Sequence, residues 1–161
     1  MSDEDLVDAF ITASRALVGV AVRSIAAAPV PLTLPQHRAL VLIASGRASN
    51  VSTLQGHLGI NQSNVSRLVE RLDRLGLVSR ERSASDGRSF VIALTELGRE
   101  SLEQVTRRRR EEIAAVLAAM SDAQRADAVA AMQAFDVAAR EVGPFHESLD
   151  HATSSIGRSR R

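Results

Sequence analysis

Polar side chains that suit hydrogen bonding to nucleic acid gather between residues 62 and 71. They are Gln62, Ser63, Asn64, Ser66, Arg67 and Arg71. A side-chain amide can bond both polar atoms of an adenine edge, an Arg can bond O6 and N7 of guanine, and a hydroxyl can bond a base or a phosphate. The chemistry indicated is contact with duplex DNA. A solvated polar face on an ordinary amphipathic helix is the alternative that this pattern alone leaves open.

Two short helices are expected to position these side chains. An apolar stripe with the i, i+3, i+4, i+7 spacing of one buried helix face accompanies the polar set. Its members are Val65, Leu68, Val69, Leu72 and Leu75. Ahead of it, Gly59 can adopt the left-handed conformation that ends a helix, and Asn61 can cap the next helix. A capping box at Ser52 and Gln55 predicts the start of the first helix, so the segment predicts a helix-turn-helix.

A basic hairpin is expected directly after this motif. Residues 77–82 predict one strand, and the alternation of Phe90, Ile92 and Leu94 predicts a second. The turn dipeptide Asp86-Gly87 lies between them, with Arg82 and Arg88 on its two sides. Such a hairpin is a wing.

The recognition helix and basic wing together resemble the winged helix-turn-helix of the MarR family, the multiple antibiotic resistance regulators. The resemblance covers residues 3–142 and is carried by five segments. They are Leu58 to Ile60, Val65 to Leu72, Leu75 to Val78, Ser85 to Arg88, and Leu94 to Gly98. It implies a mainly α fold with a small β-hairpin wing, and a transcriptional regulator, expected to be a repressor, that binds a pseudo-palindromic duplex as a homodimer.

The resemblance also divides the chain. It implies a DNA-binding domain at 33–95, a helical dimerisation region made of 1–32 and 96–143, and a flexible tail at 144–161. The apolar residues expected at the dimer interface are Leu6, Phe10, Leu17, Val129, Met132 and Phe135. A long first helix has more apolar surface than a small domain needs, so we expect part of it to meet another chain. Folding back onto its own domain is the alternative.

The predicted DNA contacts differ in kind between the recognition helix and the wing, which are the two elements expected to read the DNA. Base or backbone contacts are expected from Gln62, Ser63, Asn64 and Arg67, and phosphate contacts from Ser66 and Arg71. Arg82 and Arg88 belong to the wing, where Arg88 is expected to enter the minor groove. Asp86 is expected to shape the wing, since a carboxylate does not face phosphate favourably. Gly87 stands where the family pattern commonly has a second Arg, which predicts a weaker minor-groove contact.

The composition narrows the classes of function that the protein can have. The 161 residues suit about one domain, and there is no Cys, which excludes disulfides and thiolate metal sites. The four His have no metal-site spacing, and no catalytic constellation or Gly-rich phosphate loop is visible, so we expect no metal, no cofactor and no enzyme. The aromatic fraction of 2% favours duplex DNA over single strands. No export or membrane segment is visible, and a cytoplasmic protein is expected.

Two expectations concern residues outside the recognition helix and the wing. His37, at the start of a helix with Thr33 as its cap, is a candidate ligand contact, but a surface position is the expected one. The run Arg107 to Arg110 is expected to be solvated, with a DNA-backbone role as the alternative. The resemblance implies a small phenolic or lipophilic effector in an interhelical pocket. A winged helix used only for protein interaction, without specific DNA binding, is the alternative function.

Overall fold

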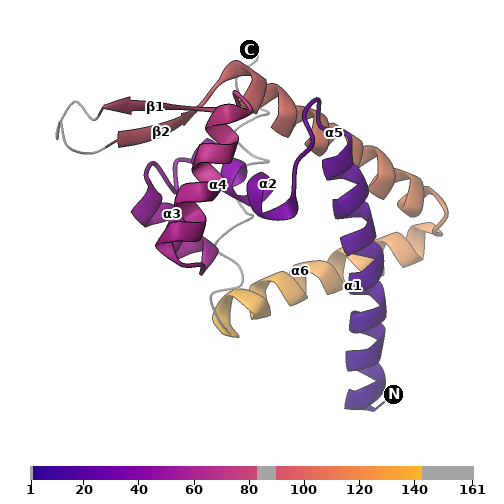
Figure 1. Ribbon diagram of the computed structural model, residues 1–161. Coiled ribbons are helices and arrows are strands. Elements are labelled where there is room, and N and C mark those ends of the chain that lie inside the picture. Colours follow the sequence, from indigo (N-terminus) through magenta and orange to yellow (C-terminus); the bar gives the residue numbers. More distant parts are fainter. Residues whose placement is uncertain (1, 83–89, 143–161) are drawn as a thin grey trace.

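The computed structural model describes residues 2–82 and 90–142, which form six helices and one antiparallel hairpin (Figure 1). The helices are α1 (Asp3–Ala26), α2 (Leu34–Ala44), α3 (Val51–Leu58), α4 (Gln62–Arg74), α5 (Glu96–Ala118) and α6 (Asp122–Val142), and the strands are β1 (Val78–Arg82) and β2 (Phe90–Leu94). The expected fold class, a mainly α protein with a β-hairpin wing after a helix-turn-helix, is confirmed.

Side-chain caps define the helix starts. Thr33 caps α2, as the sequence predicts, and Thr95 caps α5. The expected start of α3 at Ser52 is wrong, because Asn50 caps this helix instead. Asn50 is extended, and its Oδ1 accepts a hydrogen bond of 2.9 Å from the backbone N of Thr53. The amide oxygen of Asn50 therefore satisfies the free N–H of Thr53, and Ser52 lies inside the first turn of the helix.

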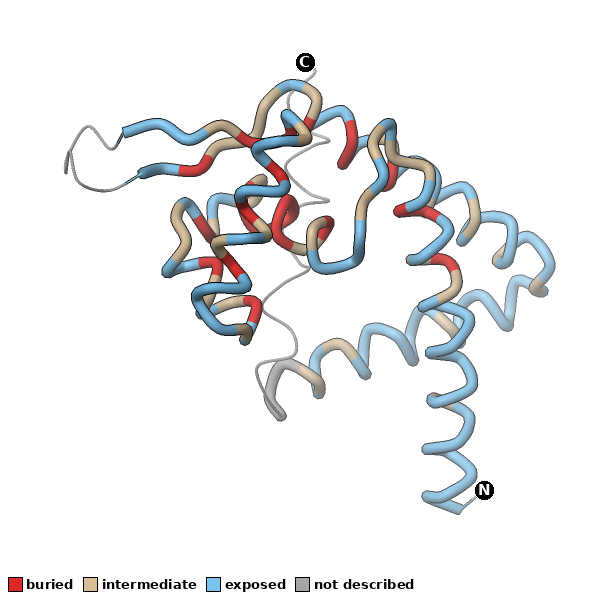
Figure 2. Tube along the Cα trace, viewed as in Figure 1, coloured by how far each residue is buried: buried red, intermediate tan, exposed pale blue. Residues whose placement is uncertain are grey.

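The core lies among α2, α3, α4, the base of the wing and the start of α5 (Figure 2). Its fully buried large side chains include Leu40, Leu42, Leu54, Val65, Val69, Leu72 and Leu77. These residues come from consecutive segments of the chain and meet in one cluster. The cluster fixes the two helices of the helix-turn-helix against α2 and leaves the outer face of α4 in solvent.

The wing pairs residue by residue from Val78 opposite Leu94 to Arg82 opposite Phe90. Val78 and Ile92 are buried near the base, whereas the outer half of the hairpin is exposed. The backbone N of Ile92 also donates to the carbonyl O of Ser49 over 2.7 Å. The base of the wing is therefore tied to the segment before α3.

The helices α1 and α5 pack along each other, while α6 turns back below α5 and crosses α1 near its middle in the view of Figure 1. Two polar side-chain contacts between described residues join α1 to α5. Arg23 Nε lies 2.7 Å from Glu112 Oε2, and Arg109 Nε donates to Ser24 Oγ over 3.2 Å. Figure 2 shows that the N-terminal half of α1 and most of α6 are exposed. These helices therefore present apolar surface that the described chain does not cover.

Candidate nucleic-acid interface

The reading helix α4 is fixed at its start and along its inner face. Gly59 ends α3 in the left-handed conformation with φ 66°, and Asn61 Oδ1 caps α4 by accepting from Asn64 N over 2.9 Å. Val65 and Val69 are fully buried on the inner face. The turn and the buried stripe predicted from the sequence are thus confirmed, and the opposite face is fixed in orientation by them.

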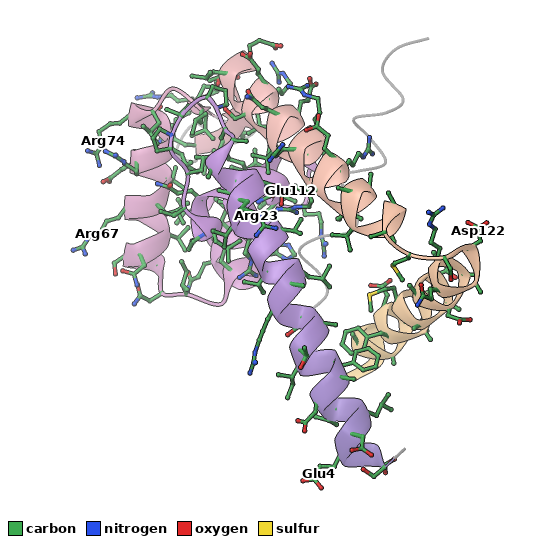
Figure 3. The ribbon with its side chains drawn as sticks, turned by 90° about the vertical axis from the view of Figure 1, so that its right-hand side faces the viewer. Glu4, Arg23, Arg67, Arg74, Glu112 and Asp122 are labelled. Atoms are coloured by element: carbon green, nitrogen blue, oxygen red, sulfur yellow. The ribbon has the colours of Figure 1, made fainter. Side chains whose placement is uncertain are left out.

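That opposite face carries the predicted polar set. Gln62, Ser63, Asn64, Arg67 and Arg71 are exposed, and Ser66 is half-buried. Figure 3 shows Arg67 and Arg74 pointing outward from the helix, away from the rest of the molecule. The structure brings the six side chains onto one helix, within reach of a ligand that approaches from solvent.

The side-chain donors on this face have few partners among the residues that the structure describes. Ser63 Oγ donates to Asn61 Oδ1 over 2.8 Å, which orients the hydroxyl but leaves its lone pairs accessible. Among the described residues, neither Arg67 nor Arg71 forms an ion pair. An Arg without an internal carboxylate retains its full charge and its five N–H donors for an external anion or base edge.

The wing contributes one described candidate. Arg82 is exposed at the outer end of β1, opposite Phe90. The other wing residues predicted to matter, Asp86, Gly87 and Arg88, lie outside the described residues. Arg80 is also exposed on β1, and a basic residue in the predicted wing strand is the sequence signal that points to it.

A buried polar cluster lies where α1, α2 and α5 meet. His37 is only 4% exposed, so the expectation that it lies on the surface is wrong. Burial, reinforced by the charge of Arg109, lowers the pKa of His37 to about 4. At this pKa the imidazole is neutral at physiological pH.

Arg109 departs in the same way from the expectation of a wholly solvated arginine run. Its guanidinium donates to the buried hydroxyl of Ser24, and desolvation by burial lowers its pKa from the ordinary value. Arg107, Arg108 and Arg110 are exposed as expected. One helical turn places four consecutive residues on all sides, so one of them must face α1 and α2.

A half-open cavity of about 410 Å³ lies between the end of α2, strand β2 and the start of α5. Its apolar lining includes Ile43, Ile92 and Leu102, and its polar lining includes Arg99 and Glu103. Arg99 is already bonded to Glu96 Oε2 over 3.1 Å and to the carbonyl O of Leu94 over 3.2 Å. The volume is in the range of small-molecule sites.

The six residues predicted at a dimer interface lie on α1 and α6. Leu6, Leu17, Val129, Met132 and Phe135 are exposed, and Phe10 is half-buried. The rings of Phe10 and Phe135 stack with their centroids 5.0 Å apart. Further large apolar side chains on α1 are exposed, namely Val7, Ile11, Val18 and Val22.

Metal-binding and membrane-spanning features are absent from the described ranges. Across residues 2–82 and 90–142, no three His, Asp or Glu side chains come close enough to hold a metal ion. None of the helices in these ranges is both long enough and apolar enough to cross a membrane.

Known proteins match this chain over the same helices and strands. Residues 30–89 match the model of the MarR family. The crystal structure of RV1404 from Mycobacterium tuberculosis is 37% identical, with a TM-score of 0.80, and the match covers 89% of this chain and 95% of that one. The structure of a MepR mutant of S. aureus bound to oligodeoxyribonucleotide is 20% identical, with a TM-score of 0.66, covering 81% and 94% of the two chains. The latter likeness concerns the fold alone.

A curated relative is similar over a shorter range. The organic hydroperoxide resistance transcriptional regulator of Bacillus subtilis (strain 168) is 33% identical over 67 residues, which are 42% of this chain and 46% of that protein. The matches to curated relatives span between 41% and 57% of their lengths.

Proposed function

We propose, from the premise that this chain belongs to the MarR family of transcriptional regulators, that it is a repressor that binds a pseudo-palindromic DNA duplex as a homodimer. The observation that carries the proposal is the outer face of α4, where all the predicted polar side chains but the half-buried Ser66 are exposed, and where Arg67 and Arg71 lack an ion pair within the described residues. A helix with this face outward suits the major groove, because the groove presents hydrogen-bonding groups that amides and Arg can read.

The proposed contacts follow from position on α4 and the wing. Gln62, Ser63, Asn64 and Arg67 lie toward the start of the helix, which enters the groove first in helix-turn-helix proteins. Ser66 and Arg71 are assigned to phosphates. Arg82 and Arg88 are assigned to the wing contact, with Asp86 and Gly87 shaping its turn.

Two copies of the chain are needed to read a pseudo-palindrome. The exposed apolar residues of α1 and α6 support a two-fold interface, because a contiguous apolar surface on several helices is costly in water. The proposed residues are Leu6, Phe10, Leu17, Val129, Met132 and Phe135. With this interface, the two α4 helices would enter major grooves about one helical turn, or roughly 34 Å, apart.

The test is a titration of the purified chain against duplex DNA from upstream of its own gene and against an unrelated duplex, at two salt concentrations. The mass of the free protein is measured in parallel. We expect a dimer that binds one duplex tightly and loses affinity as salt rises, because phosphate contacts release counterions. A dimer that binds no duplex at low salt would contradict the proposal and favour a winged helix that serves protein interaction alone.

We further propose that a small lipophilic molecule releases the DNA by binding in the cavity between α2, β2 and α5. The apolar lining suits such a ligand, and the cavity touches both the wing strand and the first turns of α5. A ligand there would favour one angle between these elements over another. Thiol oxidation is not available as a signal, because the chain has no Cys.

The effector site is tested with Leu102→Trp, which fills the cavity with a larger apolar side chain. Small phenolic and lipophilic compounds are screened for release of the wild-type protein from its duplex. A compound that releases the wild type should not release the variant, provided that both bind the duplex equally without it. Equal release of the two proteins would place the effector elsewhere.

A further inference from the structure

Thr95 lies at the meeting point of the reading helix, the wing and α5. Its Oγ1 donates to the carbonyl O of Gly76 over 2.6 Å and accepts from Gly98 N over 3.1 Å. Its backbone N donates to the carbonyl O of Leu77 over 3.1 Å. One residue therefore bonds the last residues of the turn after α4 and the first turn of α5.

The hydroxyl does more here than a helix cap requires. A capping Ser or Thr accepts a hydrogen bond from the third helical N–H, and its own proton is left to find another acceptor. In Thr95 that proton goes to Gly76, 19 residues earlier in the chain. By contrast Thr33, which caps α2, accepts from Gln36 N within its own helix.

The end of α4 is itself tightly closed. Gly76 has φ 70°, its N donates to Asp73 O over 2.8 Å, and Leu77 N donates to Leu72 O over 3.0 Å. This is the Schellman arrangement that ends many helices. The closing residues Gly76 and Leu77 are those that Thr95 bonds, so the end of α4 and the start of α5 are joined through this one residue.

The hydrogen bonds of Thr95 to Gly76 and Leu77 form a joint between α4 and α5, and Gly98 completes this joint on the side of α5. A Cβ added to Gly98 would lie 2.1 Å from the carbonyl O of Leu77, which leaves no space between the two backbones. The helix α5 then extends 23 residues, about 34 Å, toward α6. The joint therefore stands between the reading helix and the helices that carry the exposed apolar surface.

We propose that Thr95 is a positioning residue whose hydroxyl bond to Gly76 sets the orientation of α4 relative to α5, and thereby the separation of the two reading helices in the dimer. The inference rests on the proposed function, because a fixed separation matters only to a dimer that reads two half-sites. Without the bond, the wing and the buried inner face of α4 remain, but the C-terminal end of α4 loses a contact that fixes its angle to α5.

Three substitutions separate the bond from the cap. Thr95→Val removes both, and Thr95→Asp keeps a capping oxygen for Gly98 N but has no proton for Gly76. Thr33→Val is the matched control, because it removes a helix cap that is not part of the joint. Thr95→Asp keeps the test possible if Thr95→Val does not fold.

The first measurement does not depend on DNA. The chain has no native Cys, so Arg74→Cys on the exposed end of α4 accepts a single spin label in each protomer. The label-to-label distance is then measured in the dimer by pulsed EPR. We expect a narrow distribution for the otherwise wild-type protein and for Thr33→Val, and a broadened distribution for Thr95→Val and Thr95→Asp. Equally narrow distributions in all four proteins would overturn the inference.

The second measurement uses the duplex and the same duplex with one base pair inserted between its half-sites. Wild type and Thr33→Val should prefer the original spacing, and both Thr95 variants should lose about tenfold in that preference, the size of one lost hydrogen bond to a positioned group. A purely structural Thr95 would lower the melting temperature and leave the preference unchanged. A wild-type dimer that binds neither duplex would instead refute the proposed function, with the EPR result still deciding the joint.

Discussion

Gly98 and Leu77 approach so closely that a Cβ on Gly98 would lie 2.1 Å from the Leu77 carbonyl oxygen. Real Cβ atoms do not come this near to a backbone oxygen, so Gly98→Ala must push α5 away from the base of the wing. We expect it to lower the free energy of unfolding by about 3 kcal/mol, the upper end of overpacking costs. Urea denaturation followed by circular dichroism measures the change.

Gly56→Ala is the matched control for that substitution. Gly56 lies inside α3, and an added Cβ there would meet nothing within 4 Å. Because Ala favours the helix more than Gly does, we expect Gly56→Ala to raise the free energy of unfolding by roughly 0.5 to 1 kcal/mol. Equal effects of the two substitutions would contradict the close approach of Gly98 to Leu77.

The burial of His37 predicts a pH dependence of stability. In the folded chain its pKa is about 4, against an ordinary value of 6.5. The unfolded chain therefore binds a proton as the pH falls below about 6.5 while the folded chain does not. The stability is complete above this pH and is lost down to about pH 4, by on the order of 3 kcal/mol in total.

The contribution of His37 is isolated by comparison with His37→Gln, which has no titratable group at this position. Carboxylates also titrate in acid, but they are common to both proteins. Between about pH 6 and pH 5 the wild type should lose about 1 kcal/mol of unfolding free energy more than the variant does. Parallel pH profiles for the two proteins would show that His37 is accessible to protons in the folded state.

Local structure could be predicted from the sequence where neighbouring residues alone determine it. Gly59, Asn61 and the Val65 stripe determine a turn and a buried face from neighbouring residues alone. The cap at Asn50 could not be chosen in this way. The spacing of a capping box fits both Asn50 with Thr53 and Ser52 with Gln55, and the choice between them depends on which residue has an extended backbone. Such a choice is made by the path of the chain between α2 and α3, which no local pattern specifies.

Residues that act between distant segments could not be predicted in the same way. His37 and Arg109 are far apart in the sequence, and only the packing of α1, α2 and α5 places them together. Thr95 was recognisable as a cap, but its second bond, to Gly76, depends on how the wing returns the chain to the end of α4. The exposed polar face of α4 was predictable because helical periodicity assigns it without tertiary information.

The exposure of Phe135, which stacks on Phe10, offers a test of the part that α6 plays in the proposed dimer. The pair joins α1 to α6, and Phe135 is 53% exposed in the single chain. Phe135→Ala should remove both the stacking and apolar area available to a second chain, and we expect it to weaken the proposed dimer by about tenfold or more. Sedimentation velocity over a range of concentrations measures the monomer–dimer equilibrium.

Phe90→Ala tests whether any exposed Phe would have that effect. Phe90 is 52% exposed and lies on the wing, so it matches Phe135 in residue type and in exposure. We expect its loss to leave the dimer equilibrium unchanged. A shift as large as that of Phe135→Ala would place the wing in the interface between protomers.

Arg67 is the sharpest test of the reading helix, because its exposed guanidinium has no ion pair among the described residues. If it bonds a guanine edge, Arg67→Ala should cost about 1 to 3 kcal/mol of binding free energy for the duplex with that base and much less for a duplex in which the base is changed. If it bonds only a phosphate, the loss is the same for both duplexes, and the salt dependence falls by about one counterion. Arg107→Ala, an exposed Arg on α5, is the control that removes the same charge from another helix. Equal losses for Arg67→Ala and Arg107→Ala would show that net charge, and not the face of α4, determines the affinity.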